Sequence, residues 1–173
     1  MCQGYASWRT SPYVLPYPVG EGYIVSQGNC SSGGHSGAAR YAYDFWMPVG
    51  TLVTAARAGI VETVIEIYQD GDHAPSHANL VRVRHEDGTY AVYAHLTHNG
   101  ALVAEGTPVE RGSRIGRSGN SGATGGKPHL HLDFAPCLVI SAGECATLPV
   151  TFSNTDPNPN GLQFGHHYVA MAY

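Results

Sequence analysis

The segment Pro128-His129-Leu130-His131-Leu132 carries two imidazoles separated by one residue. In an extended strand alternate side chains share a face, so His129 and His131 point the same way. The two leucines point to the opposite face, where they can enter a core. Histidine is the commonest metal ligand and also the usual general acid or base near neutral pH. The pair can therefore be two metal ligands, or one ligand and one catalytic group.

Two residues near the start of the chain could complete such a site. His35 lies in the Gly- and Ser-rich segment 31–37, and Asp44 follows nine positions later in an aromatic, strand-like run. Taken alone, His35 would be a solvated loop residue and Asp44 a hydrogen-bonded structural acid. A buried Asp44 charge needs compensation, which a cation with histidine partners provides. Together with the His-Leu-His strand, these two residues favour a metal site.

A predicted hairpin and a glycine-rich loop frame the two-histidine strand. The run 89–96 follows the turn signal Glu-Asp-Gly and is expected to pair with a strand at 80–84. His95 lies near the end of that run and is expected to share a face with Tyr93. The segment 112–122 is expected to be a glycine-rich loop that lets backbone approach a site closely and leaves room for an extended peptide.

Four motifs, taken in chain order, resemble those of lysostaphin-type zinc metallopeptidases, which cut peptidoglycan peptides. They are His35 with Asp44, Tyr93-Ala94-His95-Leu96, Ser118-Gly119-Asn120-Ser121-Gly122 and Pro128-His129-Leu130-His131. The resemblance spans roughly residues 22–135. Four ordered motifs of matching residue types are far more specific than a lone His-x-His pattern.

The resemblance implies a role for each of five residues. His35, Asp44 and His131 would bind one zinc ion per chain, while His95 and His129 would act on the water and the substrate. Three protein ligands leave one tetrahedral position for water, whose pKa zinc lowers to about 7. One of the two remaining histidines would assist deprotonation of that water, and the other would steady the oxyanion or protonate the departing amine. The sequence does not assign which does which.

Other titratable residues are left outside the predicted site. Asp133 shares the face of His129 and His131 and could orient an imidazole, but an exposed acid at a strand end is an equal alternative. His73 and His77 lie in a Pro- and Gly-containing segment, for which we expect a surface loop that could also form one wall of a groove. No role is assigned to His85, His98, His166 and His167.

Composition predicts an all-β fold. The chain has 173 residues, of which 43% are hydrophobic and only 13% charged, with 22 Gly and 11 Pro. Short runs rich in Val, Ile, Thr and Tyr between turn signals favour an antiparallel β-sandwich or barrel-like fold with few helices. The clearest strands are 51–54 and 59–67. The resemblance implies a substrate groove over one sheet.

The length predicts a single domain over residues 1–173. The resemblance implies that it is a metallopeptidase domain with a catalytic core at about 22–135. The segment 136–173 is expected to close the domain with a strand at 168–170. No apolar run is long enough to span a membrane. The net charge of −4 gives no basic surface for nucleic acid. The expected partners are peptidoglycan peptides, and we expect a monomer.

Four cysteines indicate an oxidising compartment. Four cysteines allow three pairings, and the sequence does not choose among them. We favour the pairing in which Cys137 and Cys145 close a small loop, and in which Cys2 with Cys30 could tether the N-terminus. Residues 1–20 lack the charged start and apolar core of a signal peptide, so export to the periplasm, cell envelope or medium is inferred.

The predicted function is zinc-dependent endopeptidase activity on the stem peptide or cross-bridge of peptidoglycan. The alternative is a non-catalytic envelope module that binds peptidoglycan or regulates a cell-wall hydrolase. Such relatives typically lack one or more metal ligands, whereas His35, Asp44 and His131 are intact here. A third possibility is a general extracellular protease of elastin-like, Gly-rich proteins, which differs in substrate more than in chemistry.

Overall fold

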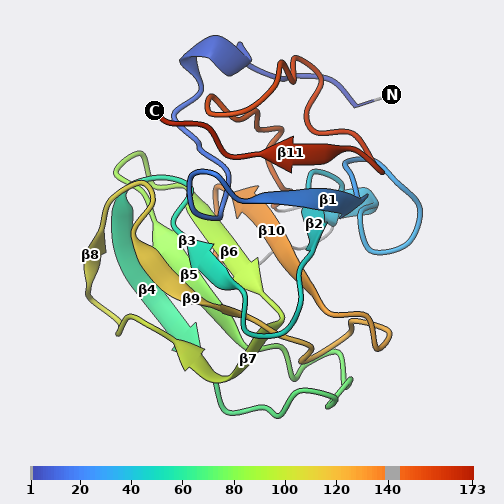
Figure 1. Ribbon diagram of the computed structural model, residues 1–173, viewed down its shortest axis with the longest axis vertical. Coiled ribbons are helices and arrows are strands. Elements are labelled where there is room, and N and C mark those ends of the chain that lie inside the picture. Colours follow the sequence, from blue (N-terminus) through green and yellow to red (C-terminus); the bar gives the residue numbers. More distant parts are fainter. Residues whose placement is uncertain (1, 139–144) are drawn as a thin grey trace.

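The structure is a computed structural model that describes residues 2–138 and 145–173 (Figure 1). Met1 and residues 139–144 of the expected closing segment lie outside the described residues. The elements in chain order are η1 (Trp8–Thr10), β1 (Gly22–Gln27), η2 (Gly37–Ala39), β2 (Tyr43–Trp46), β3 (Leu52–Thr54), β4 (Gly59–Ile65), β5 (Leu80–Arg84), β6 (Tyr90–Ala94), β7 (Leu96–Ala101), β8 (Pro108–Val109), β9 (Arg114–Ser118), β10 (His129–Ala135) and β11 (His167–Val169). The prediction of an all-β fold with few helices is confirmed.

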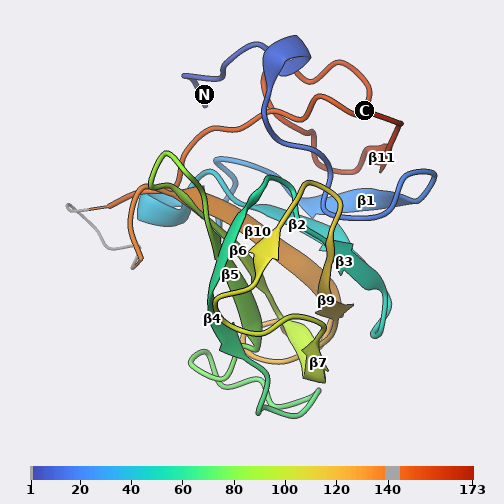
Figure 2. The ribbon, with the colours of Figure 1, turned by 90° about the vertical axis from the view of Figure 1, so that its left-hand side faces the viewer.

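The strands form two antiparallel sheets. In the described residues the larger sheet has the order β11-β1-β2-β10-β6-β5-β4-β8, and the smaller has β3-β9-β7. Figure 2 shows the smaller sheet lying against one face of the part of the larger sheet made by β4, β5, β6 and β10. The expected antiparallel sandwich is therefore present, with one face of the larger sheet covered and the other left for a groove.

Several strands agree with the sequence pattern, and one does not. β5 and β6 form the expected hairpin, in which Val81 lies opposite Tyr93. β3 and β4 fall within the predicted runs 51–54 and 59–67. The segment 112–122, however, is a loop only in part, because β9 occupies its first half and pairs with both β3 and β7. Burial of Ile115 in the core stabilises this strand despite the flanking glycines.

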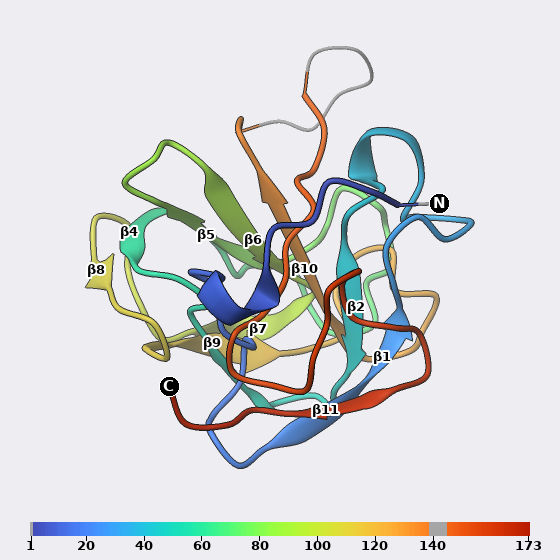
Figure 3. The ribbon, with the colours of Figure 1, turned by 90° about the horizontal axis from the view of Figure 1, so that it is seen from above.

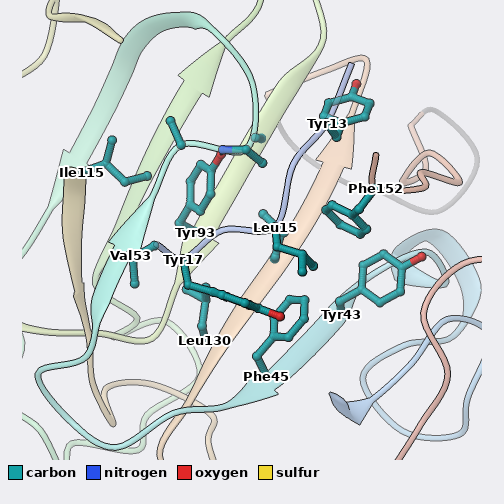
Figure 4. Close-up of a cluster of buried hydrophobic side chains, with 14 of the residues drawn as sticks. Tyr13, Leu15, Tyr17, Tyr43, Phe45, Val53, Tyr93, Ile115, Leu130 and Phe152 are labelled. Carbon is teal, nitrogen blue, oxygen red and sulfur yellow. The ribbon is translucent and has the colours of Figure 1, made fainter. Parts of the chain in front are cut away.

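The hydrophobic core lies between the two sheets and extends to the terminal segments, which contribute Leu15 and Phe152 (Figure 4). Tyr93 of β6 and Leu130 of β10 meet Val53 of β3 and Ile115 of β9 there, and all four side chains are fully buried. Burial of one such aliphatic side chain stabilises the fold by about 1.5–3 kcal/mol. The Tyr93 hydroxyl accepts a hydrogen bond from the backbone N–H of Ala56 at 2.7 Å, so its polar end is satisfied.

Strand β10 connects the core with the opposite face of the larger sheet. Leu130, Leu132 and Phe134 are fully buried in the core. Because strand side chains alternate, His129 and His131 project from the other face of the sheet. The core leucines thus anchor the strand whose outer face carries the two imidazoles.

The two ends of the chain pack together over one end of the sandwich (Figure 3). β11 pairs with β1 in the larger sheet, in the region where the sequence predicts a C-terminal strand. The N-terminal segment is held by a hydrogen bond from the backbone N–H of Ser153 to the carbonyl of Tyr13. Within the described residues no helix combines the length and apolar character needed to cross a bilayer.

Both favoured disulfides are formed. Cys2 is bonded to Cys30, and Cys137 to Cys145. The first ties the N-terminus to the loop that follows β1 and precedes His35. The second closes a short segment after β10, most of which lies outside the described residues.

Candidate metal centre

Neighbouring strands β2 and β10 bring two of the predicted ligands side by side. Asp44 of β2 lies opposite His131 of β10 in the antiparallel register. Asp44 faces away from the core, because Tyr43 and Phe45 on either side of it are fully buried there. His131 Nδ1 lies 2.8 Å from Asp44 Oδ1. The pairing of these two strands therefore sets the spacing of a carboxylate and an imidazole.

His35 reaches the same point from a loop rather than a strand. The loop leaves β1 at Gly28, whose carbonyl lies 3.1 Å from His35 Nδ1. The other ring nitrogen, Nε2, lies 3.2 Å from Asp44 Oδ1, and His35 is only 1% exposed. One ligand atom from each of His35, Asp44 and His131 lies within 4.8 Å of the other two, so the three could hold a metal ion.

The hydrogen bonds of the two imidazoles indicate that a positive charge belongs between these residues. His35 Nδ1–H donates to the Gly28 carbonyl. In the neutral ring Nε2 therefore carries a lone pair, which points at the carboxylate of Asp44. His131 Nε2 lies 3.1 Å from Asp133 Oδ2, which leaves Nδ1 aimed at Asp44 in the same way. The lone pairs of the two imidazoles and the carboxylate of Asp44 repel one another unless a proton or a cation lies between them. The donor set fits a divalent cation of the zinc type.

The carboxylates dominate the electrostatics of this cluster. Burial alone would raise the pKa of Asp44, but hydrogen bonds from His131 and His35 hold it well below its usual range. Burial alone would lower the pKa of His131, but the carboxylates of Asp133 and Asp44 raise it to about 10. In the described residues no Lys or Arg side chain forms an ion pair with Asp44. A bound cation would supply the charge that the two carboxylates favour.

His95 and His129 lie beside the cluster, with their ring centroids 4.7 Å apart. His95 Nδ1 donates to the carbonyl of Ser121 at 2.7 Å, and His129 Nδ1 donates to that of Lys127 at 2.8 Å. These bonds select the tautomer whose Nε2 is unprotonated. Burial, together with the neighbouring His131 and His129, lowers the pKa of His95 to about 4. His95 is therefore neutral at pH 7, with a lone pair on Nε2.

His95 does not share a face with Tyr93, and that expectation is wrong. Tyr93 lies in the core between the sheets, whereas His95 lies on the groove side, 5.9 Å from His131 between ring centroids. The reason is the backbone at His95, which has φ +63° and interrupts the alternation between β6 and β7. A left-handed conformation at a non-glycine residue costs about 1–3 kcal/mol and is found mostly at functional sites.

The five predicted residues share one groove on the outer face of the larger sheet. Its volume is about 340 Å³. The lining consists of Gln27, Gly34, His35, Asp44, His95, Ala123, Thr124, Gly125, His129 and His131. The loops 28–36 and 119–127 form its sides, and the pair of strands β2 and β10 forms its floor.

The family model for Peptidase family M23 matches residues 38–136, which is more than half of the chain. This chain belongs to peptidase family M23. The matched segment contains Asp44, His95, His129 and His131 and begins just after His35. The resemblance read from the four motifs is thereby confirmed.

Curated relatives of this M23 family member match over about half of its length. It is 39% identical over 90 residues to the peptidoglycan DD-endopeptidase ShyA of Vibrio cholerae, a match that covers 52% of this chain and 19% of ShyA. It is 36% identical over 95 residues to the cell division protein DipM of Caulobacter vibrioides, covering 53% of this chain and 14% of DipM. The matched segment thus corresponds to less than a fifth of the length of either relative.

Solved structures of M23 peptidases share the fold. The catalytic domain of lysostaphin from Staphylococcus simulans superposes with a TM-score of 0.51 at 23% identity, covering 79% of this chain and 84% of that one. The deep-sea M23 metalloprotease pseudoalterin superposes with a TM-score of 0.57 at 20% identity, covering 93% and 96%. These likenesses support the fold of the chain.

Two residues left out of the predicted site lie within or against it. Asp133 is 5% exposed and contacts His131, so it is not the exposed strand-end acid of the alternative reading. Alternation along β10 is the signal that could have included it. Gln27 lines the groove because β1 pairs with β2 and places it opposite Asp44, a register that no local pattern reveals.

The loop that carries His73 and His77 contacts the groove from outside. His73 Nδ1 lies 3.1 Å from the hydroxyl of Thr124, which lines the groove, whereas His77 stacks on Tyr68. Neither imidazole is among the groove-lining residues. The contact of His73 with Thr124 places this loop against the groove wall, and His77 is held within the loop region by Tyr68 and Asp72.

Proposed function

We propose that this chain is a zinc-dependent endopeptidase that hydrolyses peptide bonds in bacterial peptidoglycan, in the stem peptide or the cross-bridge. The observation that carries the proposal is the gathering of His35, Asp44 and His131 beside His95 and His129 in one groove. Relatives named as peptidoglycan DD-endopeptidases support peptidoglycan as the substrate class. The complete donor set argues against a non-catalytic binding module.

The proposed zinc ligands are His35 through Nε2, Asp44 through a carboxylate oxygen and His131 through Nδ1. When bound, zinc supplies positive charge that polarises a peptide carbonyl and makes water more acidic. His95 and His129 each keep Nδ1–H on a backbone carbonyl, so Nε2 is the atom that takes a proton from the attacking water or delivers one to the departing amine. Each such proton transfer contributes about 10²–10⁴-fold to the rate.

The setting of the enzyme is part of the same proposal. We propose a single metallopeptidase domain over residues 1–173 that acts as a monomer outside the cytoplasm, in the periplasm or the medium. The two disulfides support this location, because cysteine pairs persist in oxidising compartments.

The function is tested on purified peptidoglycan of several cross-bridge types. Mass spectrometry of the released fragments is expected to show new peptide termini with zinc-loaded protein and none after treatment with a chelator. The new termini identify the bond that is cut. Intact walls in every case, with zinc bound, would support the binding module instead.

Two variants separate the proposed roles. His129→Ala is expected to retain zinc and to lose about 10²-fold or more of the rate, because only a proton-transfer group is removed. His131→Ala is expected to lose zinc as well as activity, because a ligand is removed. Metal content by atomic absorption and turnover of the same wall fragments are measured together. Full activity in either variant contradicts the assignment.

A further inference from the structure

Trp46 is an exposed aromatic residue on the face of the sheet that carries the candidate metal centre. It ends β2, where Tyr43 and Phe45 are fully buried in the core and alternate with Asp44. By the same alternation, Trp46 projects from the face of Asp44. It is nevertheless 54% exposed. A single exposed apolar side chain is common on a protein surface, so the position of Trp46 beside the candidate metal centre, and not its exposure, carries the argument.

The strand register places Trp46 next to a proposed catalytic histidine. Trp46 lies directly opposite His129 in the antiparallel pairing of β2 with β10. Residues paired in this way have Cβ atoms about 4.5–5.5 Å apart. Asp44 and His131 form the next pair on the same face. The indole is therefore one step along the sheet from the ligands and immediately beside His129.

Trp46 forms one side of a shallow hollow of about 500 Å³. The hollow lies between the end of β2 and the loop that leads into β10, and its lining is Trp46, Met47, Pro48, Gly126, Lys127 and Pro128. The hollow lies next to the groove. Gly125 lines the groove and Gly126 lines the hollow, and the carbonyl of Lys127 accepts a hydrogen bond from His129 Nδ1 at 2.8 Å. One segment of chain thus shapes the hollow and orients the histidine.

We propose that this hollow is a substrate subsite, in which Trp46 receives an apolar side chain of the peptide next to the bond that is cut. The inference rests on the proposed endopeptidase function and adds a specificity to it. An extended peptide that crosses the groove places the side chain of a flanking residue over the hollow.

The chemistry of the lining favours an apolar side chain over a sugar or an acidic group. Tryptophan and two prolines offer apolar surface, and an indole presents a large rigid face to an aliphatic group. Recognition of a sugar requires hydrogen-bonding groups that match its hydroxyls. Lys127 is the only charged side chain in the lining and is exposed, so it can remain in water while its stem adds apolar contact.

The test compares matched peptides on the zinc-loaded full chain. One peptide contains only glycine around a fluorophore and quencher pair, and the others carry a single leucine at successive positions. Wild type is expected to cleave the best leucine peptide with a kcat/KM about tenfold or more above that of the all-glycine peptide, as an apolar pocket discriminates. Trp46→Ala is expected to abolish that preference through KM, with zinc content unchanged.

Two further variants serve as controls. Trp46→Phe is expected to keep most of the preference, because an aromatic face remains. Phe164→Ala removes another exposed aromatic side chain, 72% exposed and outside both the groove and the hollow, and is expected to change nothing. A preference that survives in Trp46→Ala, or an equal loss on all peptides, overturns the subsite.

Failure of the subsite proposal can be distinguished from failure of the proposed endopeptidase function. If wild type cleaves neither peptides nor peptidoglycan, the endopeptidase proposal fails. Calorimetric binding of the same peptides to zinc-loaded wild type and Trp46→Ala still decides the subsite in that case. Tighter binding of the leucine peptide by wild type alone supports it, and equal or absent binding overturns it.

Discussion

Four histidines in the groove each use one ring nitrogen for a hydrogen bond and present the other to the same small volume. The acceptors are the carbonyl of Gly28 for His35, that of Ser121 for His95, that of Lys127 for His129 and the carboxylate of Asp133 for His131. Three acceptors are neutral carbonyls and one is a charged carboxylate. A carboxylate partner raises the basicity of an imidazole more than a carbonyl does, so His131 is the best prepared of the four to donate electrons to a metal.

The first prediction concerns Asp133. Asp133→Asn keeps the shape of the side chain but removes its charge, so His131 becomes a weaker ligand. We expect zinc affinity to fall about 10–100-fold. Competition with a chromophoric chelator measures the affinity, and circular dichroism checks the fold. Asp156→Asn, which alters an exposed acid elsewhere, serves as the matched control. Equal affinity in the two variants would show that Asp133 has no influence on the metal.

At the scale of elements, two loops position the groove. The loop 69–79 holds the loop 119–127 through backbone hydrogen bonds from Gly71 to Asn120 at 3.1 Å and from Gly122 to Asp72 at 2.7 Å. The second of these loops supplies the Ser121 carbonyl that orients His95. The first loop therefore acts on the groove indirectly, through these backbone contacts and through the contact of His73 with Thr124.

Gly122 is the point at which this contact is tightest. Its φ is +77°, and a Cβ placed there would lie 2.8 Å from Ala78 Cβ and 3.0 Å from Ala78 N. Gly122→Ala is expected to push the two loops apart and to lower kcat about tenfold or more, because His95 loses its orientation. Zinc content is expected to stay normal, since no proposed ligand lies in either loop.

Gly106→Ala is the control for Gly122→Ala. Gly106 has a similar φ of +82° but open space where its Cβ would lie. It shares the cost of a left-handed backbone, about 1–2 kcal/mol, without the clash. Steady-state kinetics, metal content and melting temperature are compared for both variants. Equal kinetic losses would mean that backbone strain alone, and not the loop contact, explains the effect.

At the scale of the whole molecule, the disulfide between Cys2 and Cys30 joins the N-terminus to the loop that carries His35. Its sequence separation is 28 residues, against 8 for Cys137 and Cys145. The chain-entropy model gives a larger stabilisation for the longer loop, about 3.5 against 2.5 kcal/mol. The longer bridge also lies close to a proposed metal ligand, and the shorter one lies after β10.

The effects of removing the two disulfides are therefore expected to differ in unfolding free energy and in zinc affinity. The double variant Cys2→Ser with Cys30→Ser should lose about 1 kcal/mol more unfolding free energy than Cys137→Ser with Cys145→Ser. It should also bind zinc more weakly, because the loop of His35 gains freedom. Urea unfolding and chelator competition measure the two effects. Zinc affinities that are the same in both double variants would contradict the link to His35.

A buried histidine outside the groove predicts a dependence of stability on pH. His85 is 1% exposed, its Nδ1 lies 2.9 Å from the Thr89 hydroxyl, and its Nε2 has no partner among the described residues. Burial, together with the charge of Arg57, lowers the pKa of His85 from 6.5 to about 4. Folding therefore favours the neutral ring, and the unfolded chain binds more protons between these two values.

The sign follows from that difference in proton binding. The contribution of neutral His85 to the free energy of unfolding is fully present above about pH 6.5 and is lost as the pH falls toward 4. We expect it to cost about 2 kcal/mol of unfolding free energy between pH 7 and pH 5. His85→Gln should remove this part of the pH slope, and His166→Gln, at an exposed site, should not. Denaturant unfolding at the two pH values checks the prediction, and parallel slopes in wild type and His85→Gln would refute it.

Local pattern alone determined much of the fold and of the candidate site. The period of two in β10 predicts both the buried leucines and the outward imidazoles, because alternation is a property of a single extended strand. The turn signal before Tyr90 predicts the hairpin of β5 and β6 for the same kind of local reason. Residue types and their order were enough to predict family M23 membership.

Tertiary structure decided the remaining features, because they depend on strands and loops that are distant in the sequence. Burial of Asp133 beside His131, the position of Gln27 opposite Asp44 and that of Trp46 opposite His129 follow from strand register. His95 turns toward the groove because its backbone is left-handed, and its ring is held there by a hydrogen bond to the Ser121 carbonyl. Register and burial are set by the packing of the whole chain, and no period within one segment encodes them.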